Sequence, residues 1–347
     1  MTKETSQKIK NMGLICALLV VSIHIDWHED ESQLLWWGRQ LICNGFAQIA
    51  VPFFFVVSGY FLAAHFDEDG WWKRENQKRI RTLIVPFMFW SLIYYAFISA
   101  VTICRNLYAH NPIDTDLYFN MTHILGFDMN RTPLLSPLWY VRNLVLLVLT
   151  GGIFKFAVRR LRTLWIVLAF ILYQVCSPSA LSVITGLDAT PIGGFILHGY
   201  SRLGFLYFSI GVYIRQLPHW KLSNKTALIC FVVGLSLLAT EITLQKMEMS
   251  WSRVLSSTYM PLILLSFYHF IPSTEWPRIL TACSFPIFVM HMIPLRLSII
   301  LSNHFLLLAP EIDTLLQWSV SVTIPIAVAV LLRRFFPKTA SILFGGR

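Results

Sequence analysis

The chain has 347 residues, of which 56% are hydrophobic and only 13% carry a charged side chain. Soluble domains average about 25% charged residues, so the composition excludes an ordinary soluble protein and indicates an integral membrane protein. The formal charge of +10 could suggest a nucleic-acid partner. The basic residues, however, form short clusters between apolar runs, and no basic stripe is interleaved with aromatic residues. We therefore expect a lipid bilayer as partner, and no nucleic acid.

Apolar runs extend along nearly the whole chain and predict a single all-α membrane domain over residues 1–347. A helix needs about 20 mostly apolar residues to cross a bilayer. Ten spans are predicted, and in chain order they cover residues 11–28, 42–64, 83–103, 136–154, 163–177, 195–214, 226–244, 254–271, 281–302 and 314–332. An even number of spans places both termini on the same side of the membrane.

The basic clusters decide which side the termini occupy. Lys and Arg concentrate before the first predicted span, after every second span, and after the last one. An excess of Lys and Arg marks cytoplasmic loops, so both termini are predicted to be cytoplasmic. The outward half of the first span then holds His24, and the longest outer loop covers residues 105–133.

His24 is an ionisable residue inside an apolar run. Such residues cost free energy in hydrocarbon, so His24 is a candidate for function, although a hydrogen-bonded packing role is about as common. A buried imidazole tends to stay neutral and can accept a proton from a hydroxyl, as a general base does. Asp26 points to another face of the helix, whereas His28 shares the face of His24. Two histidines alone are a weak signal, and no metal is predicted.

Two other stretches place polar groups in or beside spans. Gly59, between Ser58 and Tyr60, predicts a close approach of two helices. Arg142 stands within the fourth span, beside Trp139, Tyr140 and Asn143. An intramembrane Arg is a functional candidate by default.

The remaining polar groups lie at the third and ninth spans. Lys78, Arg79 and Arg81 stand at the cytoplasmic entrance of the third span, either as an ordinary basic flank or as a binding cluster. The ninth span contains His291 and Arg296.

In combination these stretches resemble the acyltransferase-3 family of membrane acyltransferases. GLICALLVVSIH (13–24) is similar to the family's Arg-x10-His helix, which ends in its catalytic histidine. VPFFFVVSGYFLA (51–63) resembles its FF-x-x-SG-[FY] span, and KRIRTLIVPFMFW (78–90) its basic entry followed by Pro. PLWYVRNL (137–144) resembles its W-[FY]-x-x-x-L segment, and FPIFVMHMI (285–293) its penultimate-span histidine pattern.

One position departs from the family pattern. Eleven residues before His24, where the family commonly has Arg, this chain has Gly13. Eleven residues span about three helical turns, or ~16 Å, and return to the same helix face. Lys10 lies one turn further back on that face. We hypothesise that Lys10, or a basic residue of 78–81, takes the place of that arginine.

The resemblance implies an O-acyltransferase in a bacterial inner membrane. It would take an acyl group, usually acetyl, from cytoplasmic acetyl-CoA and pass it to a hydroxyl of a cell-surface carbohydrate or lipid-linked glycan precursor. His24 would be the general base, and Arg142 would stabilise oxyanion charge. The residues expected to bind donor phosphates are Lys10, Lys78, Arg79 and Arg81. The residues expected to contact substrate are Trp139, Tyr140, Ser58 and His291.

Two other functions fit the same spans. A transporter or flippase of lipid-linked sugars would also place His, Arg and Glu241 in the membrane, although no internal repeat is visible. A scaffold subunit of a polysaccharide assembly complex would tolerate the loss of His24. Acyl-CoA dependence separates a transferase from a carrier. The sequence does not identify the acceptor, the acyl group or the oligomeric state, and whether a covalent intermediate forms, for example on Ser58 or Ser22, stays open.

Overall fold

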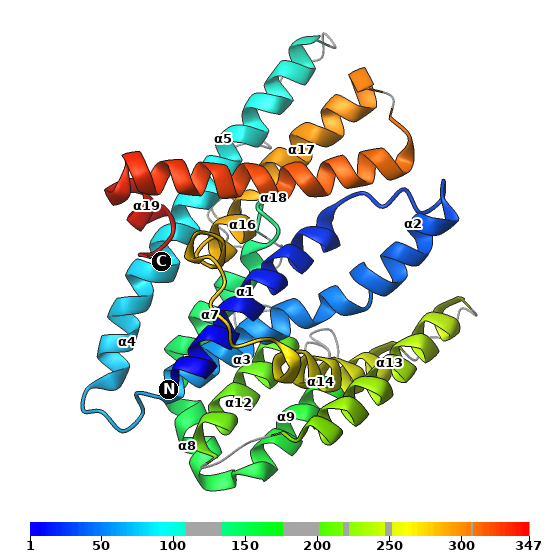
Figure 1. Cartoon of the computed structure of the whole chain (residues 1–347). Helices are drawn as coiled ribbons and strands as arrows, with labels where there is room; N and C mark the ends of the chain where they lie inside the picture. The colour runs from blue at the N-terminus through cyan, green and yellow to red at the C-terminus, as the bar shows by residue number, and fades with distance from the viewer. Residues whose placement is uncertain (109–132, 176–200, 218–221, 247–251, 307, 347) are drawn as a thin grey trace, which may run out of the picture.

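The computed structural model describes residues 1–108, 133–175, 201–217, 222–246, 252–306 and 308–346, and every regular element in these ranges is helical (Figure 1). The all-α prediction is confirmed for this part of the chain. Most of the predicted outer loop 105–133 lies outside the described residues.

The N-terminal half begins with the long helix α1. Two longer helical segments follow, one from α2 to α3 and one from α4 to α5, and each is interrupted by irregular helical turns. Its elements are α1 (Lys3–His24), α2 (Gln33–Gly38), the π-helical turn η1 (Arg39–Cys43), the 3-10 turn η2 (Phe46–Ile49), α3 (Ala50–Ala63), α4 (Trp71–Arg79), the π-helical turn η3 (Ile80–Ile84), α5 (Val85–Tyr108), α7 (Leu138–Leu149), α8 (Gly151–Leu161) and α9 (Thr163–Val175).

The C-terminal half adds a helix pair and two long helical segments that lie side by side. Its elements are α12 (Arg202–Gln216), α13 (Asn224–Lys246), α14 (Ser252–Phe270), α15 (Arg278–Thr281), α16 (Ser284–Met290), α17 (Met292–Leu301), the π-helical turn η6 (Ser302–Leu306), α18 (Pro310–Phe335) and α19 (Pro337–Leu343). α13 packs on α14, and α17 packs on α18 (Figure 1).

Five helical segments among the described residues are long and apolar enough to cross a membrane, which supports a multi-pass membrane protein. Two bent helix pairs raise the number to seven if each pair forms one span: α7 with α8, bent by 64°, and α16 with α17 and η6, bent by 48°. The predicted count of ten is not confirmed, because the predicted spans 163–177 and 195–214 lie partly outside the described residues, which show 13 residues of helix in α9 and 15 in α12 against the ~20 that a straight span requires.

α1 lies at the centre of the bundle, in contact with α3, α16 and α18. Its first turn is capped by Thr2, whose hydroxyl accepts a hydrogen bond from the Thr5 N–H at 3.1 Å. Further along, the fully buried Asn11 donates hydrogen bonds to the carbonyl oxygens of Pro272 and Thr274 at 2.9 and 3.0 Å. These bonds fasten the first half of α1 to the loop that leads into α15.

Two glycines allow α3 and α12 to pack with their backbones in contact. A Cβ atom added to Gly59 would lie 2.2 Å from the Phe208 carbonyl oxygen, and one added to Gly211 would lie 2.0 Å from that of Val56. Both distances are impossible for real side chains. The close approach predicted at Gly59 is therefore confirmed, and it lets α3 pack directly against α12.

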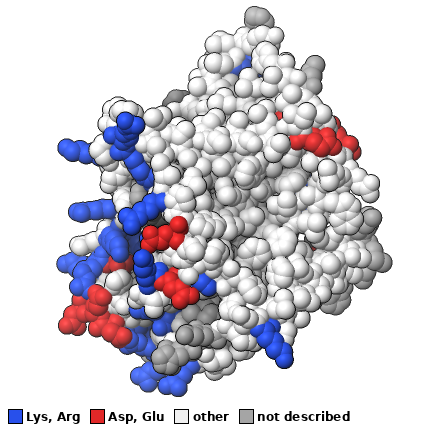
Figure 2. Space-filling model, viewed as in Figure 1, with Lys and Arg blue, Asp and Glu red and all other residues white. Residues whose placement is uncertain are grey.

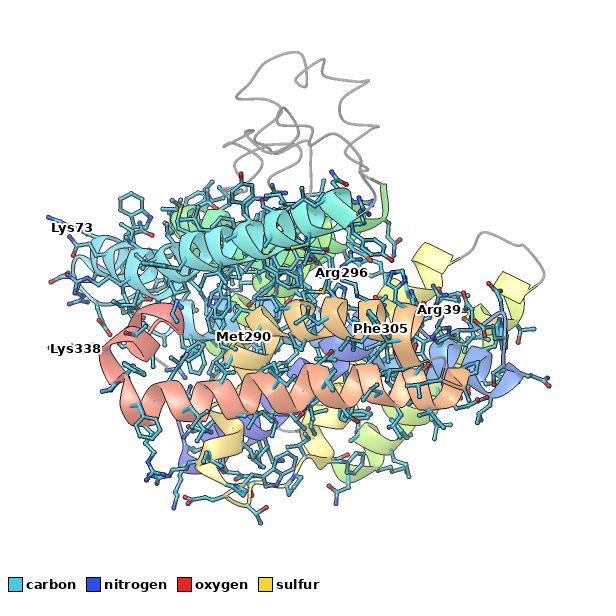
Figure 3. All side chains as sticks on the ribbon, turned by 90° about the horizontal axis from the view of Figure 1, so that it is seen from above. Arg39, Lys73, Met290, Arg296, Phe305 and Lys338 are labelled. Carbon is cyan, nitrogen blue, oxygen red and sulfur yellow. The ribbon has the colours of Figure 1, made fainter. Side chains whose placement is uncertain are left out.

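Charge is distributed unevenly over the molecule. Figure 2 shows Lys and Arg side chains gathered along one edge, and Figure 1 places both chain termini toward that edge. In Figure 3, Lys73 and Lys338 lie at this end, and Arg39 and Phe305 lie at the opposite one. The arrangement is the one that the positive-inside rule favours. That this end faces the cytoplasm stays a prediction.

Candidate active site

Two histidines from distant parts of the chain meet inside the bundle. His24 is the last residue of α1 and is partly buried, whereas His291 lies between α16 and α17 and has no exposed surface. Their ring centroids are 5.2 Å apart, with the ring planes tilted by 36°. Of the residues predicted to form the site, these two are therefore in direct contact.

The surroundings of His291 fix the orientation of its ring. Its Nδ1 lies 3.0 Å from the Ile287 carbonyl oxygen, which can only accept, so Nδ1 carries the hydrogen. In the neutral ring Nε2 is then an acceptor. This atom is buried and has no hydrogen-bond partner within the described residues. A buried acceptor without a partner is costly in a purely structural role, which makes it a functional candidate.

The bend between α16 and α17 occurs at His291 itself. Figure 3 shows the preceding residue, Met290, between the two ends of the molecule that Lys338 and Phe305 mark. Breaks in membrane helices are tolerated where the freed backbone is buried in protein or lines a cavity. The break therefore places the histidine pair in the interior of the bundle.

A cavity of about 190 Å³ is lined in part by Phe288, which lies on α16 and precedes His291 by three residues, although neither histidine is among its lining residues. Its walls come from α3, α7 and the segment that leads into α16, and the lining residues are Phe54, Tyr140, Thr281, Ala282, Ser284, Phe285 and Phe288. The Tyr140 ring lies 5.7 Å from that of Phe288 and 6.0 Å from that of Phe54. Because Phe288 precedes His291 by three residues, both side chains lie on neighbouring parts of one helix surface.

Gly13, on α1, lies close to Ser284, which is one of the residues that line the cavity. A Cβ atom at Gly13 would be 3.8 Å from Ser284 Oγ, an ordinary van der Waals distance. The family that the sequence resembles commonly has arginine at this position. In this chain the position has no side chain, and it faces a residue that lines the cavity.

Of the predicted substrate contacts, Tyr140 lines the cavity and Ser58 is hydrogen-bonded to it. Ser58 Oγ on α3 lies 3.5 Å from the Tyr140 hydroxyl, at the limit of a hydrogen bond. Trp139 instead packs against Phe55, with ring centroids 6.3 Å apart. Arg142 is partly buried on the same helix and is not among the residues that line the cavity.

The predicted donor-binding cations are divided between an ion-pair cluster and the surface. The buried carboxylate of Glu75 pairs with Lys78 at 3.4 Å and with Arg79 at 3.3 Å, so these two cations already have a partner. Arg81 and Lys10 are exposed.

Lys10 contributes to a second charged cluster near the start of α15. The hydrogen bond from Lys3, together with the charges of Lys3, Arg278 and Lys10, holds the pKa of the Glu275 carboxyl below its usual range. The salt bridge from Lys3 to Glu275 measures 3.1 Å. Lys10 and Arg278 thus lie close to the loop that enters the cavity wall.

A polar network that sequence reasoning missed holds the chain just beyond His24. The Asp26 N–H donates to Gln317 Oε1 at 2.8 Å, and the Thr314 hydroxyl donates to the Asp26 carbonyl oxygen at 3.0 Å. Both partners belong to α18. The network thereby fixes the end of α1, and with it the position of His24.

Asp313 is the centre of this network and is only 4% exposed. Its carboxylate lies 2.7 Å from His28 Nε2 and accepts further hydrogen bonds from Gln317, at 2.8 Å, and from Ser302. The available signal in the sequence was the spacing of Asp313 and Gln317, which places both on one face at the start of the last span.

His28, outside the membrane-spanning helix, has a perturbed pKa. Burial alone would lower it, but the hydrogen bond to Asp313, the charge of Asp26 and the hydrogen bond to Glu31 raise the pKa of His28 above its usual value. The protonated ring can then bridge the two carboxylates, with Glu31 at 3.1 Å from Nδ1. This ion pair ties the segment after α1 to α18.

Comparison with known proteins identifies the family of the chain. The family model described as an acyltransferase domain, acyltransferase-3, matches residues 9–334. The succinoglycan biosynthesis protein ExoH of Rhizobium meliloti (strain 1021) is 25% identical over 170 residues, which cover 46% of this chain and 45% of that protein. No solved structure matches the chain. Since the family model covers nearly the whole sequence, the protein belongs to the acyltransferase-3 family.

Proposed function

We propose that this membrane acyltransferase moves an acyl group, acetyl in the simplest case, from cytoplasmic acyl-CoA to a hydroxyl of a carbohydrate. The observation that carries the proposal is the contact between His24 and the buried His291 at a helix break, three residues after Phe288, which lines an aromatic-walled cavity. A general base must be held in a fixed orientation within reach of the reacting hydroxyl. The bundle provides such a place.

In the proposed step, neutral His24 takes the proton of the acceptor hydroxyl while the hydroxyl oxygen forms a bond to the thioester carbonyl carbon. The carbon–sulfur bond then breaks and coenzyme A leaves as a thiolate, to which His24 returns the proton. Arg142 is proposed to stabilise the negative charge on the carbonyl oxygen. A positioned base of this kind contributes roughly 10²- to 10⁴-fold to the rate.

His291 is proposed to support His24 and to contact the substrate. Its hydrogen bond to Ile287 leaves Nε2 as a buried acceptor, in a ring whose centroid is 5.2 Å from that of His24. An acceptor at this place can receive a hydrogen bond from the protonated form of His24 or from the acceptor hydroxyl. Either contact would stabilise the transition state more than the ground state.

Donor and acceptor are proposed to enter from opposite ends of the bundle. Lys10, Lys78, Arg79 and Arg81 lie on the basic side and would attract the phosphates of acyl-CoA. Tyr140, with Ser58 at its hydroxyl, and Trp139 would contact the acyl group or a sugar ring. The bundle would lie in the bacterial inner membrane, with both termini in the cytoplasm.

The carbohydrate acceptor is supported by the similarity to ExoH, a succinoglycan biosynthesis protein. The match covers under half of that protein, so the acceptor class is part of the proposal. A cell-surface polysaccharide or its lipid-linked precursor satisfies both the membrane location and the need for a free hydroxyl.

Inverted membrane vesicles that contain the protein provide the test. Labelled acetyl-CoA is added outside, and the label in total glycan is measured with and without the protein. Transfer that depends on acyl-CoA supports the proposal. A sugar-lipid carrier would move glycan without consuming thioester, and this result would contradict the proposal.

A further inference from the structure

α18 lies antiparallel to the bent segment that carries His291, and side-chain bonds at both ends fix their alignment. At one end Arg333 Nη2 donates to the Ala282 carbonyl oxygen at 2.9 Å, and at the other the Ser302 hydroxyl donates to the Asp313 carboxylate. The chain from Ala282 to Ser302 is as long as the chain from Asp313 to Arg333. His291, nine residues after Ala282, is therefore about level with the position nine residues before Arg333.

The face of α18 at this level is buried. Buried residues recur at every fourth position along it: Asp313, Gln317, Ser321, Pro325 and Ala329. α18 packs against both α16 and α17. Ser321 has no exposed surface, and it lies three residues, or ~4.5 Å along the helix axis, from the position level with His291. The two residues therefore lie at neighbouring levels in the interior of the bundle.

The hydroxyl of Ser321 has no hydrogen-bond partner among the described residues. A serine or threonine inside a helix commonly donates to the carbonyl oxygen four residues earlier, as Thr323 does to Ser319 at 2.8 Å. Ser321 makes no such bond. Pro325 lacks an N–H, so the carbonyl oxygen of Ser321 also loses its usual helical partner. A buried hydroxyl in this state is costly in a purely structural role, which makes it a candidate for binding a ligand.

His291 provides a complementary group. Its Nε2 is a buried acceptor that also has no partner in the described part of the chain, so His291 and Ser321 do not bond each other. A ligand hydroxyl between them could donate to Nε2 and accept from the Ser321 O–H, because a hydroxyl does both. A second hydroxyl, on the adjacent carbon of the same ligand, would then face His24, whose ring centroid is 5.2 Å from that of His291.

We propose that Ser321 and His291 bind one hydroxyl of a vicinal diol in the acceptor, while His24 acts on the hydroxyl of the adjacent carbon. The inference rests on the proposed function and names its substrate class, an acceptor with hydroxyls on adjacent carbons, as sugar rings carry them. An alcohol with a single hydroxyl would leave the two buried groups unpaired, which weakens its binding. No covalent bond forms or breaks at Ser321, whose hydroxyl binds and orients the acceptor.

The first experiment compares Ser321→Ala with Thr323→Val in the vesicle assay. Each variant removes one hydroxyl from α18, but Thr323 is exposed and its hydroxyl is bonded within the helix. Ser321→Ala is expected to raise the KM for total cell glycan by about 10-fold, the effect of one hydrogen bond, and to leave the KM for acetyl-CoA unchanged. Thr323→Val should retain both native values. An unchanged KM for glycan in Ser321→Ala, or an equal rise for donor and acceptor, would overturn the inference.

Competition by two small alcohols tests the substrate class. Cyclohexane-1,2-diol has hydroxyls on adjacent carbons, whereas cyclohexanol has one hydroxyl on the same ring. In the native protein the diol should inhibit transfer to glycan at a concentration about 10-fold lower than cyclohexanol, and Ser321→Ala should remove most of this difference. Equal inhibition of the native protein by the two alcohols would contradict a vicinal-diol site.

Binding measured without a donor separates this inference from the proposed function. Purified protein is unfolded thermally with and without oligosaccharides released from total cell glycan, since a ligand of the folded state raises Tm. The rise should be smaller in Ser321→Ala than in native protein and Thr323→Val. This result in a protein that transfers no acyl group would uphold the diol site while the transferase proposal fails.

Two outcomes of the same measurement would overturn the diol site. One is a rise in Tm of equal size in native protein and Ser321→Ala, or no rise in either. The other is a lower Tm of Ser321→Ala in the absence of oligosaccharide, because loss of an unpartnered hydroxyl should not destabilise the protein. Such a loss of stability would show that the Ser321 hydroxyl serves the fold.

Discussion

The ring of His28 lies 2.7 Å from the buried carboxylate of Asp313, so the segment that follows His24 is bound to the last long helix. This contact raises the pKa of His28, together with the charge of Asp26 and the hydrogen bond to Glu31, although burial alone would lower it. This part of the link between α1 and α18 thus depends on the protonation of His28, which lies four positions beyond the proposed base His24.

The first prediction concerns pH. Because the pKa of His28 is higher in the folded than in the unfolded protein, its contribution to stability is complete below the ordinary histidine pKa. It is lost as pH rises through the raised folded-state value. Thermal unfolding from about pH 5 to about pH 9 should therefore show a fall in Tm in this window, and His28→Gln should remove the fall. An unchanged pH profile in His28→Gln would contradict the account.

The second prediction concerns Asp313 as a positioning residue. Asp313→Asn keeps the size of the side chain but weakens its bonds to His28 and Gln317, which fix the end of α1. We expect kcat to fall about 10- to 100-fold through misplacement of His24, with little change in the KM for donor. Glu311→Gln is the control, because Glu311 is exposed and bonds only the Ser32 hydroxyl among the described contacts. A rise in KM without a fall in kcat would argue against a positioning role.

The third prediction concerns the contact between α3 and α12. Gly59→Ala should lower the free energy of unfolding by about 1–3 kcal/mol, because its new methyl group would collide with the Phe208 backbone. Gly152→Ala should be neutral or slightly stabilising, since no atom lies within 4 Å of a Cβ at that position. Chemical unfolding in one detergent compares the two variants directly. Equal stability would show that the helices separate at little cost.

The fourth prediction concerns the acyl group. Phe288→Ala removes an aromatic wall between the cavity and His291, which leaves room for a longer chain. The ratio of kcat/KM for butyryl-CoA over acetyl-CoA should rise about 10-fold, the order that one or two methylenes contribute in an apolar pocket. Phe305→Ala, at an exposed position, is the control and should leave the ratio unchanged. An unchanged ratio in Phe288→Ala would place the acyl group elsewhere.

The helical class and the membrane setting could be predicted because apolar runs dominate the chain. The number of spans could not be predicted. A bend such as the one at His291, or the one between α7 and α8, depends on packing, and hydropathy does not encode packing. Hydropathy alone treats each apolar run as one straight span. The close approach at Gly59, in contrast, follows from the absence of a side chain within such a run.

The individual candidate residues of the site could be predicted from the sequence, but the contacts between them could not. His24 and His291 stood out because each is an ionisable group in an apolar run, but periodicity within one helix cannot show that two helices bring them together. Asp313 resembled an ordinary polar flank of the last span, and its role became visible only through its contact with His28.

The most direct test of the central claim is acyl transfer by the His24→Ala variant at matched expression, with the exposed His304→Ala as control. The account predicts that His24→Ala loses transfer from acetyl-CoA by about 100-fold or more, as expected for removal of a general base, while His304→Ala keeps the native rate. Transfer by His24→Ala at a rate close to that of His304→Ala would remove His24 from the chemistry.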